Sequence, residues 1–81
     1  MAAIARVGDK DTSRHPIGEG SPTVFCNGLP IARVGDKDSN PDLATTGSST
    51  VFVNGMPVYR VGDMDTDGDT QVEGSSDCFA G

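Results

Sequence analysis

Few residues of this chain could take part in chemistry beyond packing: one histidine, two cysteines and a set of aspartates. His15 is the only imidazole, and Cys26 and Cys78 are the only thiols. Imidazole nitrogen and thiolate sulfur are both ligands of Zn²⁺ in proteins. Two cysteines can also form a disulfide or stay buried as inert thiols, and a histidine in a polar loop is often only solvated. The residue types alone leave these alternatives open.

The acidic segment Asp63–Asp69 is similar to the start of a calcium loop. It places carboxylates at alternate positions and Gly68 at the sixth. Position twelve is Gly74, where a calcium loop needs a bidentate Glu, and no flanking helix is predicted. We expect the first Asp of this segment to cap a tight turn through side-chain to backbone bonds. A calcium-dependent repeat module that binds a partner through its acidic turns is the alternative function.

The elements that must position these residues belong to one unit repeated at a spacing of 27 residues. A strict repeat indicates that each copy cannot bury its own apolar face and shares a core with the other copies. Three copies favour closure into a ring with pseudo-threefold symmetry, and a threefold object suggests a threefold partner. The repeated features are Val-Gly-Asp at 7–9, 34–36 and 61–63, Gly-Ser at 20–21, 47–48 and 74–75, and Phe at 25, 52 and 79.

Short apolar runs separated by turn residues predict strands and no helix. The turn residues are Asn27-Gly28 and Asn54-Gly55, and Asn-Gly is the strongest two-residue hairpin signal. The third copy stops at Gly81, before its turn, while Ala3–Val7 align with the strand that it lacks. The first and last strands are therefore predicted to pair and close the ring. The chain is predicted to be an all-β, small closed structure, with residues 1–81 as one domain.

Composition excludes several classes of function. The net charge is −6, and the six Lys and Arg residues are scattered, which argues against binding to nucleic acid or to an anionic membrane. No apolar run is long enough for a membrane helix, and no signal peptide is evident, so synthesis in the cytoplasm is expected. With 35% apolar residues in a chain of 81, the core is small and needs further stabilisation, such as a metal, a disulfide or a partner. One His with no Ser nucleophile motif and no phosphate loop predicts no enzyme.

The repeat itself resembles a known family. The segments Pro30–Asp36 and Pro57–Asp63, each following Gly-Ser-x-Thr-Val-Phe-x-Asn-Gly, are similar to the PAAR family, named for Pro-Ala-Ala-Arg. The departures are Ile or Val in place of the first Ala, and Tyr59 in place of the second Ala of the third copy.

The resemblance implies a cone of β-strands that caps the trimeric spike of a contractile injection machine, either a phage baseplate or a type VI secretion system. One copy would bind each β-helical spike trimer, of the valine-glycine-repeat or phage tail-spike type, through its broad base. The tip would pierce the target cell envelope and touch its membrane only transiently. It would belong to the virion tail tip or be secreted with the machine. The chain shows no extension beyond its repeats, so a bare tip is expected, and this favours the phage baseplate.

The resemblance also implies a metal at the apex, usually zinc held by His and Cys. On this basis we predict His15, Cys26 and Cys78 as ligands of Zn²⁺, with iron as an alternative. Asp69, Asp42 or a water would supply the fourth ligand. The cysteines occupy positions where other copies have Val or Ala, so inert packing and a disulfide formed outside the reducing cytoplasm also stay open.

One column of basic residues repeats with the unit. Arginine is the last residue of each Pro-Ala-Ala-Arg-like stretch, and threefold repetition in so acidic a chain suggests a defined partner. We expect these arginines to pair with the aspartates of the Val-Gly-Asp turns or with the base of the partner. The residues are Arg6, Arg33 and Arg60, with Asp9, Asp36 and Asp63.

Overall fold

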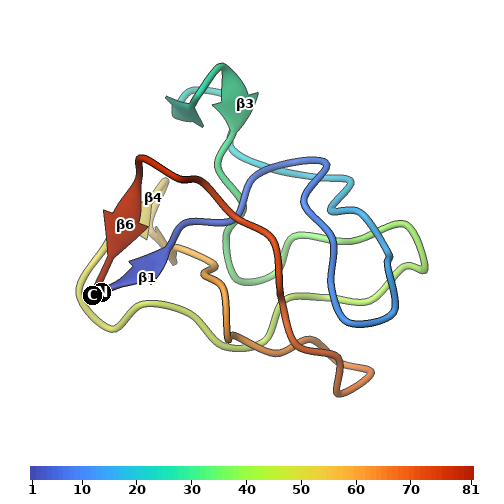
Figure 1. Cartoon of the computed structure of the whole chain (residues 1–81). Coiled ribbons are helices and arrows are strands. Elements are labelled where there is room, and N and C mark those ends of the chain that lie inside the picture. The colour runs from blue at the N-terminus through green and yellow to red at the C-terminus, as the bar shows by residue number, and fades with distance from the viewer.

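Short antiparallel hairpins are the regular elements of the chain (Figure 1). The computed structural model describes all 81 residues and contains no helix. The all-β prediction is confirmed. The strands are β1 (Ala2–Ala3), β2 (Phe25–Cys26), β3 (Leu29–Pro30), β4 (Phe52–Val53), β5 (Met56–Pro57) and β6 (Phe79–Ala80).

Two of the three hairpins are closed by the predicted Asn-Gly turns. β2 pairs with β3 and β4 pairs with β5, both antiparallel. Asn27 and Gly28 have φ of 55° and 76°, and Asn54 and Gly55 have φ of 54° and 79°. Positive φ at both turn positions is the requirement of a type I′ turn, which Asn and Gly meet at low cost. The hairpin signal in the sequence is therefore confirmed at both sites.

The third hairpin is made from the two ends of the chain. β1 pairs antiparallel with β6, with Ala2 opposite Ala80 and Ala3 opposite Phe79. Figure 1 shows the two termini side by side at this hairpin. Structurally, repeat one spans residues 4–30, repeat two spans residues 31–57, and repeat three comprises residues 58–81 completed by residues 1–3. The two ends of the chain thus meet inside repeat three.

Single β-bridges join the repeats into a ring. Arg6 pairs with Ile31 and Arg33 pairs with Val58, and Arg60 pairs with Ile4 to close the circle. Because the last bridge repeats the geometry of the other two, no repeat ends in an unpaired edge of the kind that promotes aggregation.

The core consists of threefold layers. One cluster of buried side chains lies beside the hairpins, and a second lies beside the acidic loops. Tyr59 belongs to the second layer and occupies the position of Ala5 and Ala32, so one large side chain fills space that three alanines would leave open. Its hydroxyl donates to the Asp63 carbonyl at 3.4 Å, and burial raises the pKa of Tyr59. The hairpin layer is Ile4, Cys26, Ile31, Val53, Val58 and Ala80, and the loop layer is Ala5, Ile17, Ala32, Ala44 and Tyr59.

The Val-Gly-Asp turns carry the arginine column. In repeat one, Asp9 Oδ2 accepts hydrogen bonds from the Arg6 backbone N–H at 2.8 Å and from Arg6 Nε at 3.0 Å. The same arrangement recurs in repeats two and three. The expected turn caps and the expected Arg–Asp pairs are both present, and the hydrogen bond to Asp9 is the main cause that raises the pKa of Arg6. These arginines are thus partnered within the chain.

Candidate metal centre

Three equivalent loops bring the ionisable side chains together. Each loop follows a Val-Gly-Asp turn and is closed by one β-bridge, namely Lys10 to Pro16, Lys37 to Leu43, and Met64 to Thr70. Every loop contributes two ligand-type side chains at equivalent positions. The resulting acidic cluster has an inner ring of Asp11, Asp38 and Asp65 and an outer ring of His15, Asp42 and Asp69.

The inner carboxylates build the loops that carry the outer ring. Asp11 Oδ1 accepts hydrogen bonds from the backbone N–H groups of Ser13 and His15, both at 2.9 Å. Asp38 and Asp65 make the same pair of bonds in their own loops. One carboxylate oxygen therefore fixes each loop, as expected for an Asp that mimics a backbone turn. The second oxygen, Oδ2, is left for another partner.

Three buried ligand atoms of the acidic cluster have no hydrogen-bond partner: Asp11 Oδ2, His15 Nδ1 and Asp69 Oδ2. The Asp11 side chain is only 2% exposed, and its Oδ2 lies 3.7 Å from His15 Nδ1. These three residues can place ligand atoms within 4.8 Å of one another. Burial of a polar group without a partner costs free energy, and native structures rarely leave such groups unsatisfied. An imidazole nitrogen and two carboxylate oxygens form a donor set that a divalent cation would satisfy.

Neighbouring hydroxyls orient Asp69 toward this point. Asp69 Oδ1 accepts a hydrogen bond from Ser13 Oγ at 2.7 Å and one from Thr12 Oγ1 at 3.2 Å. Both donors come from the loop of His15, across the contact between repeats three and one. These bonds occupy Asp69 Oδ1 and hold Asp69 Oδ2 at the contact between repeats three and one. Such outer partners are what fix the orientation of metal ligands.

Negative charge accumulates in the rest of the cluster. The further possible ligand groupings are His15 with Asp38 and Asp42, Asp11 with Asp38 and Asp65, and Asp42 with Asp65 and Asp69. Burial is the first cause that raises the pKa of Asp65, and the charges of Asp69 and Asp42 add to it, while backbone hydrogen bonds at Asp65 act in the other direction. A bound cation would relieve this repulsion.

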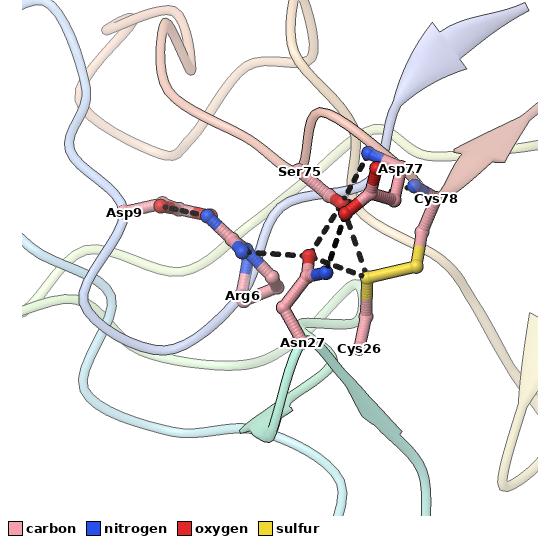
Figure 2. Close-up of a disulfide and its surroundings, with 7 residues drawn as sticks. All are labelled: Arg6, Asp9, Cys26, Asn27, Ser75, Asp77 and Cys78. Atoms are coloured by element: carbon pink, nitrogen blue, oxygen red, sulfur yellow. Dashed lines mark hydrogen bonds and ion pairs between the residues drawn. A yellow bond between two sulfur atoms is a disulfide. The ribbon is translucent and has the colours of Figure 1, made fainter.

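The cysteines lie elsewhere. Cys26 and Cys78 form a disulfide, the third of the alternatives that the sequence left open. Figure 2 shows its surroundings: Ser75 Oγ lies 3.2 Å from Cys26 Sγ and donates to Asn27 Oδ1 at 2.6 Å. Cys26 belongs to the core layer beside the hairpins, and neither cysteine joins a ligand grouping of the acidic cluster. The structure therefore does not bring His15 together with Cys26 and Cys78.

The sequence-based ligand set lacked Asp11. Its repetition at the spacing of 27 residues, as Asp11, Asp38 and Asp65, was the available signal. The single calcium loop suggested for Asp63–Asp69 does not gather its carboxylates, because Asp63 is bound to the Arg60 guanidinium. Asp65 and Asp69 join the threefold cluster instead.

Comparison with known proteins identifies the family. A family model described as PAAR motif matches residues 2–42, just over half of the chain. The chain belongs to the PAAR motif family. No curated protein matches it. PAAR proteins are structural spike-tip proteins of contractile injection machines, which associates this chain with a phage tail or a type VI secretion system and with a spike partner. The PAAR chain forms no helix that could span a membrane.

The hairpins present the other distinctive surface of this PAAR chain. Phe25, Phe52 and Phe79 occupy equivalent positions on the three hairpins and are each about half exposed, at 54%, 55% and 47%. Each hairpin is hydrogen-bonded to the preceding repeat around the ring, as when Asn54 Oδ1 of repeat two accepts from Ser21 Oγ of repeat one at 2.6 Å. Figure 1 shows the hairpins toward one side of the molecule and the three acidic loops toward the other. We call the exposed large apolar side chains of the hairpins the hairpin end, and they are Val24, Phe25, Leu29, Phe52 and Phe79.

Proposed function

We propose that this chain caps a trimeric spike through its hairpin end and carries a metal ion in its acidic cluster. The observation that carries the proposal is the separation of two threefold surfaces, one apolar and one acidic, on a single PAAR chain. One chain with three equivalent faces can match all three subunits of a spike at once. The stoichiometry is then one copy per trimer.

The hairpin end supports docking because it exposes a ring of aromatic side chains. Aromatic residues contribute large contact area at low entropic cost, and they dominate the binding energy of many interfaces. An exposed aromatic ring on a small domain is otherwise a liability for solubility. Burial against the blunt end of a trimeric spike would remove all three phenylalanines from water together.

The acidic cluster supports the metal. Asp11, His15 and Asp69 would hold Zn²⁺, with Fe²⁺ as the alternative, since imidazole and carboxylate suit both ions. When bound, the ion would supply positive charge and a cross-link between repeats at the point of the tip. The mutual repulsion of the Asp11 and Asp69 carboxylates would be offset by the attraction of both to the ion. A stiff, cross-linked tip suits a part that is driven through a cell envelope.

Docking is tested with the β-helical end of the trimeric spike protein from the same genome. Phe52→Lys should weaken binding about tenfold or more, since it places a charge in an aromatic contact. Met64→Lys is the matched control: Met64 is 45% exposed, and repeats one and two carry Lys10 and Lys37 at its position. Size-exclusion chromatography with light scattering gives the stoichiometry, and titration gives the affinity. Equal affinities for the two variants would exclude the hairpin end as the docking surface.

A further inference from the structure

The body of repeat three, residues 58–81, has no backbone connection to repeat one. It continues from repeat two at Val58, and its last strand, β6, meets β1 by strand pairing and not through a turn. The other two hairpins are closed by Asn-Gly turns, but β6 is held to β1 by only two opposed residue pairs. We call the contact between residues 58–81 and repeat one the seam. Across it, backbone hydrogen bonds such as Ile4 N–H to the Cys78 carbonyl, at 2.9 Å, are the basic attachment.

The disulfide and the proposed metal site both span the seam, one at each side of the molecule. Beside the hairpins, the disulfide joins Cys26 of repeat one to Cys78 of repeat three. In the acidic cluster, the unpartnered atoms of Asp11 and His15 belong to repeat one, and that of Asp69 belongs to repeat three. All the buried side-chain atoms without a partner therefore meet at this interface.

The other repeat contacts have no disulfide, and each of their ligand groupings contains only one residue with an unpartnered buried atom. Where repeat three has Cys78, repeat two has Val51, and where repeat one has Cys26, repeat two has Val53. Where repeat one has His15, repeat two has Asp42, whose Oδ2 already accepts from Asn40 at 2.8 Å. Repeats one to two and two to three are instead continuous in the backbone. The disulfide and the one ligand grouping whose three residues all have unpartnered atoms are thus found only where backbone continuity is missing.

We propose that the disulfide sets the metal affinity of the acidic cluster, so that the tip binds its ion tightly only after Cys26 and Cys78 are oxidised. This rests on the proposed metal site. Two links that hold the same pair of parts together cooperate, because the first lowers the entropy lost when the second forms. The bistable element is the seam, closed or locally opened, and both links favour the closed form.

The redox step needs an oxidant from outside the chain. The two thiols would persist in a reducing cytoplasm. On exposure to an oxidised thiol compound such as glutathione disulfide, the Cys26 and Cys78 sulfurs form one S–S bond and lose two protons and two electrons. The oxidant accepts them, its own S–S bond breaks, and two thiols leave. Tight cation binding would then follow departure from the cytoplasm.

The test compares Zn²⁺ affinity, by isothermal titration calorimetry, in the oxidised protein and in the double variant Cys26→Ser/Cys78→Ser. The variant has no thiols, so Zn²⁺ can bind only through the remaining residues. We expect its affinity to be at least fivefold weaker, the lower end of typical coupling between sites. Val51→Ser, at the position equivalent to Cys78 in repeat two, is the matched control and should bind within twofold of the oxidised protein. Circular dichroism establishes that each protein is folded.

Each result separates this inference from the proposed function. Weaker Zn²⁺ binding in the double variant, with unchanged binding in Val51→Ser, supports the coupling. Equal binding in the oxidised protein and the double variant would overturn the coupling and leave the metal site standing. An equal loss in the double variant and in Val51→Ser would overturn it too, because general weakening of the core would then explain both. If no protein binds Zn²⁺ or Fe²⁺, the metal site and the coupling both fail.

Discussion

The hairpin half and the acidic half of this PAAR chain use the same threefold backbone in different ways. In the hairpin half, equivalent positions hold similar side chains, such as Ile4, Ile31 and Val58, and all are buried. In the acidic half, one backbone carries His15 in one loop and Asp42 and Asp69 in the others, and ligand atoms are left without partners. Repetition in the first half builds a core. Departure from repetition in the second half creates a site.

The largest effect is expected from the hairpin half. Ile31 is 6% exposed in the hairpin layer of the core, so Ile31→Ala should lower the free energy of unfolding by about 3 kcal/mol through lost burial and a residual cavity. Chemical denaturation of the oxidised protein measures it. Val72→Ala, at a half-exposed position, is the control and should change stability by less than about 0.5 kcal/mol. Similar losses in both variants would deny that this layer is the core.

The acidic half should respond in the opposite sense. Asp11→Asn keeps the oxygen that accepts from Ser13 and His15, but it removes a buried charge that faces Asp69. We expect the metal-free variant to be as stable as the parent or more stable, by up to about 1 kcal/mol. Its zinc content by mass spectrometry should fall to background. A variant that lost stability and kept its metal would contradict the division between the two halves.

The smallest effect concerns pH. Burial raises the pKa of Asp65 above its ordinary value of 3.8, so the folded protein keeps this proton to a higher pH than the unfolded chain does. The contribution of Asp65 to stability therefore falls as pH rises from 3.8 through its folded pKa. Asp65→Asn should remove that fall. Chemical unfolding of the metal-free parent and variant, below pH 3.8 and near neutral pH, measures this change in stability. If Asp65→Asn were no more stable than the parent near neutral pH, the raised pKa of Asp65 would be refuted.

Sequence reasoning captured the parts of the fold that depend on local chemistry. Asn27-Gly28 and Asn54-Gly55 predicted two hairpins because their turns require positive φ at both positions. The alignment of Ala3–Val7 with the missing strand of repeat three predicted the pairing of β1 with β6. Both features follow from rules that need no knowledge of tertiary packing.

The site was less accessible because it depends on distances between repeats. Cys26 and Cys78 are compatible with a disulfide, a metal site or inert packing until their separation in space is known. Asp11 gave no signal beyond its repetition as Asp38 and Asp65, and only the structure shows its Oδ2 buried beside His15 and Asp69. His15 as a metal ligand stays a prediction, now with carboxylate neighbours in place of thiolates.

A crystal structure of the purified protein, with anomalous scattering measured at the zinc and iron absorption edges, tests the central claim most directly. We predict one anomalous peak per chain, in contact with Asp11 Oδ2, His15 Nδ1 and Asp69 Oδ2, and an intact disulfide between Cys26 and Cys78. A peak on the cysteine sulfurs, a calcium ion in the acidic turns, or no metal at all in protein supplied with both ions would contradict it.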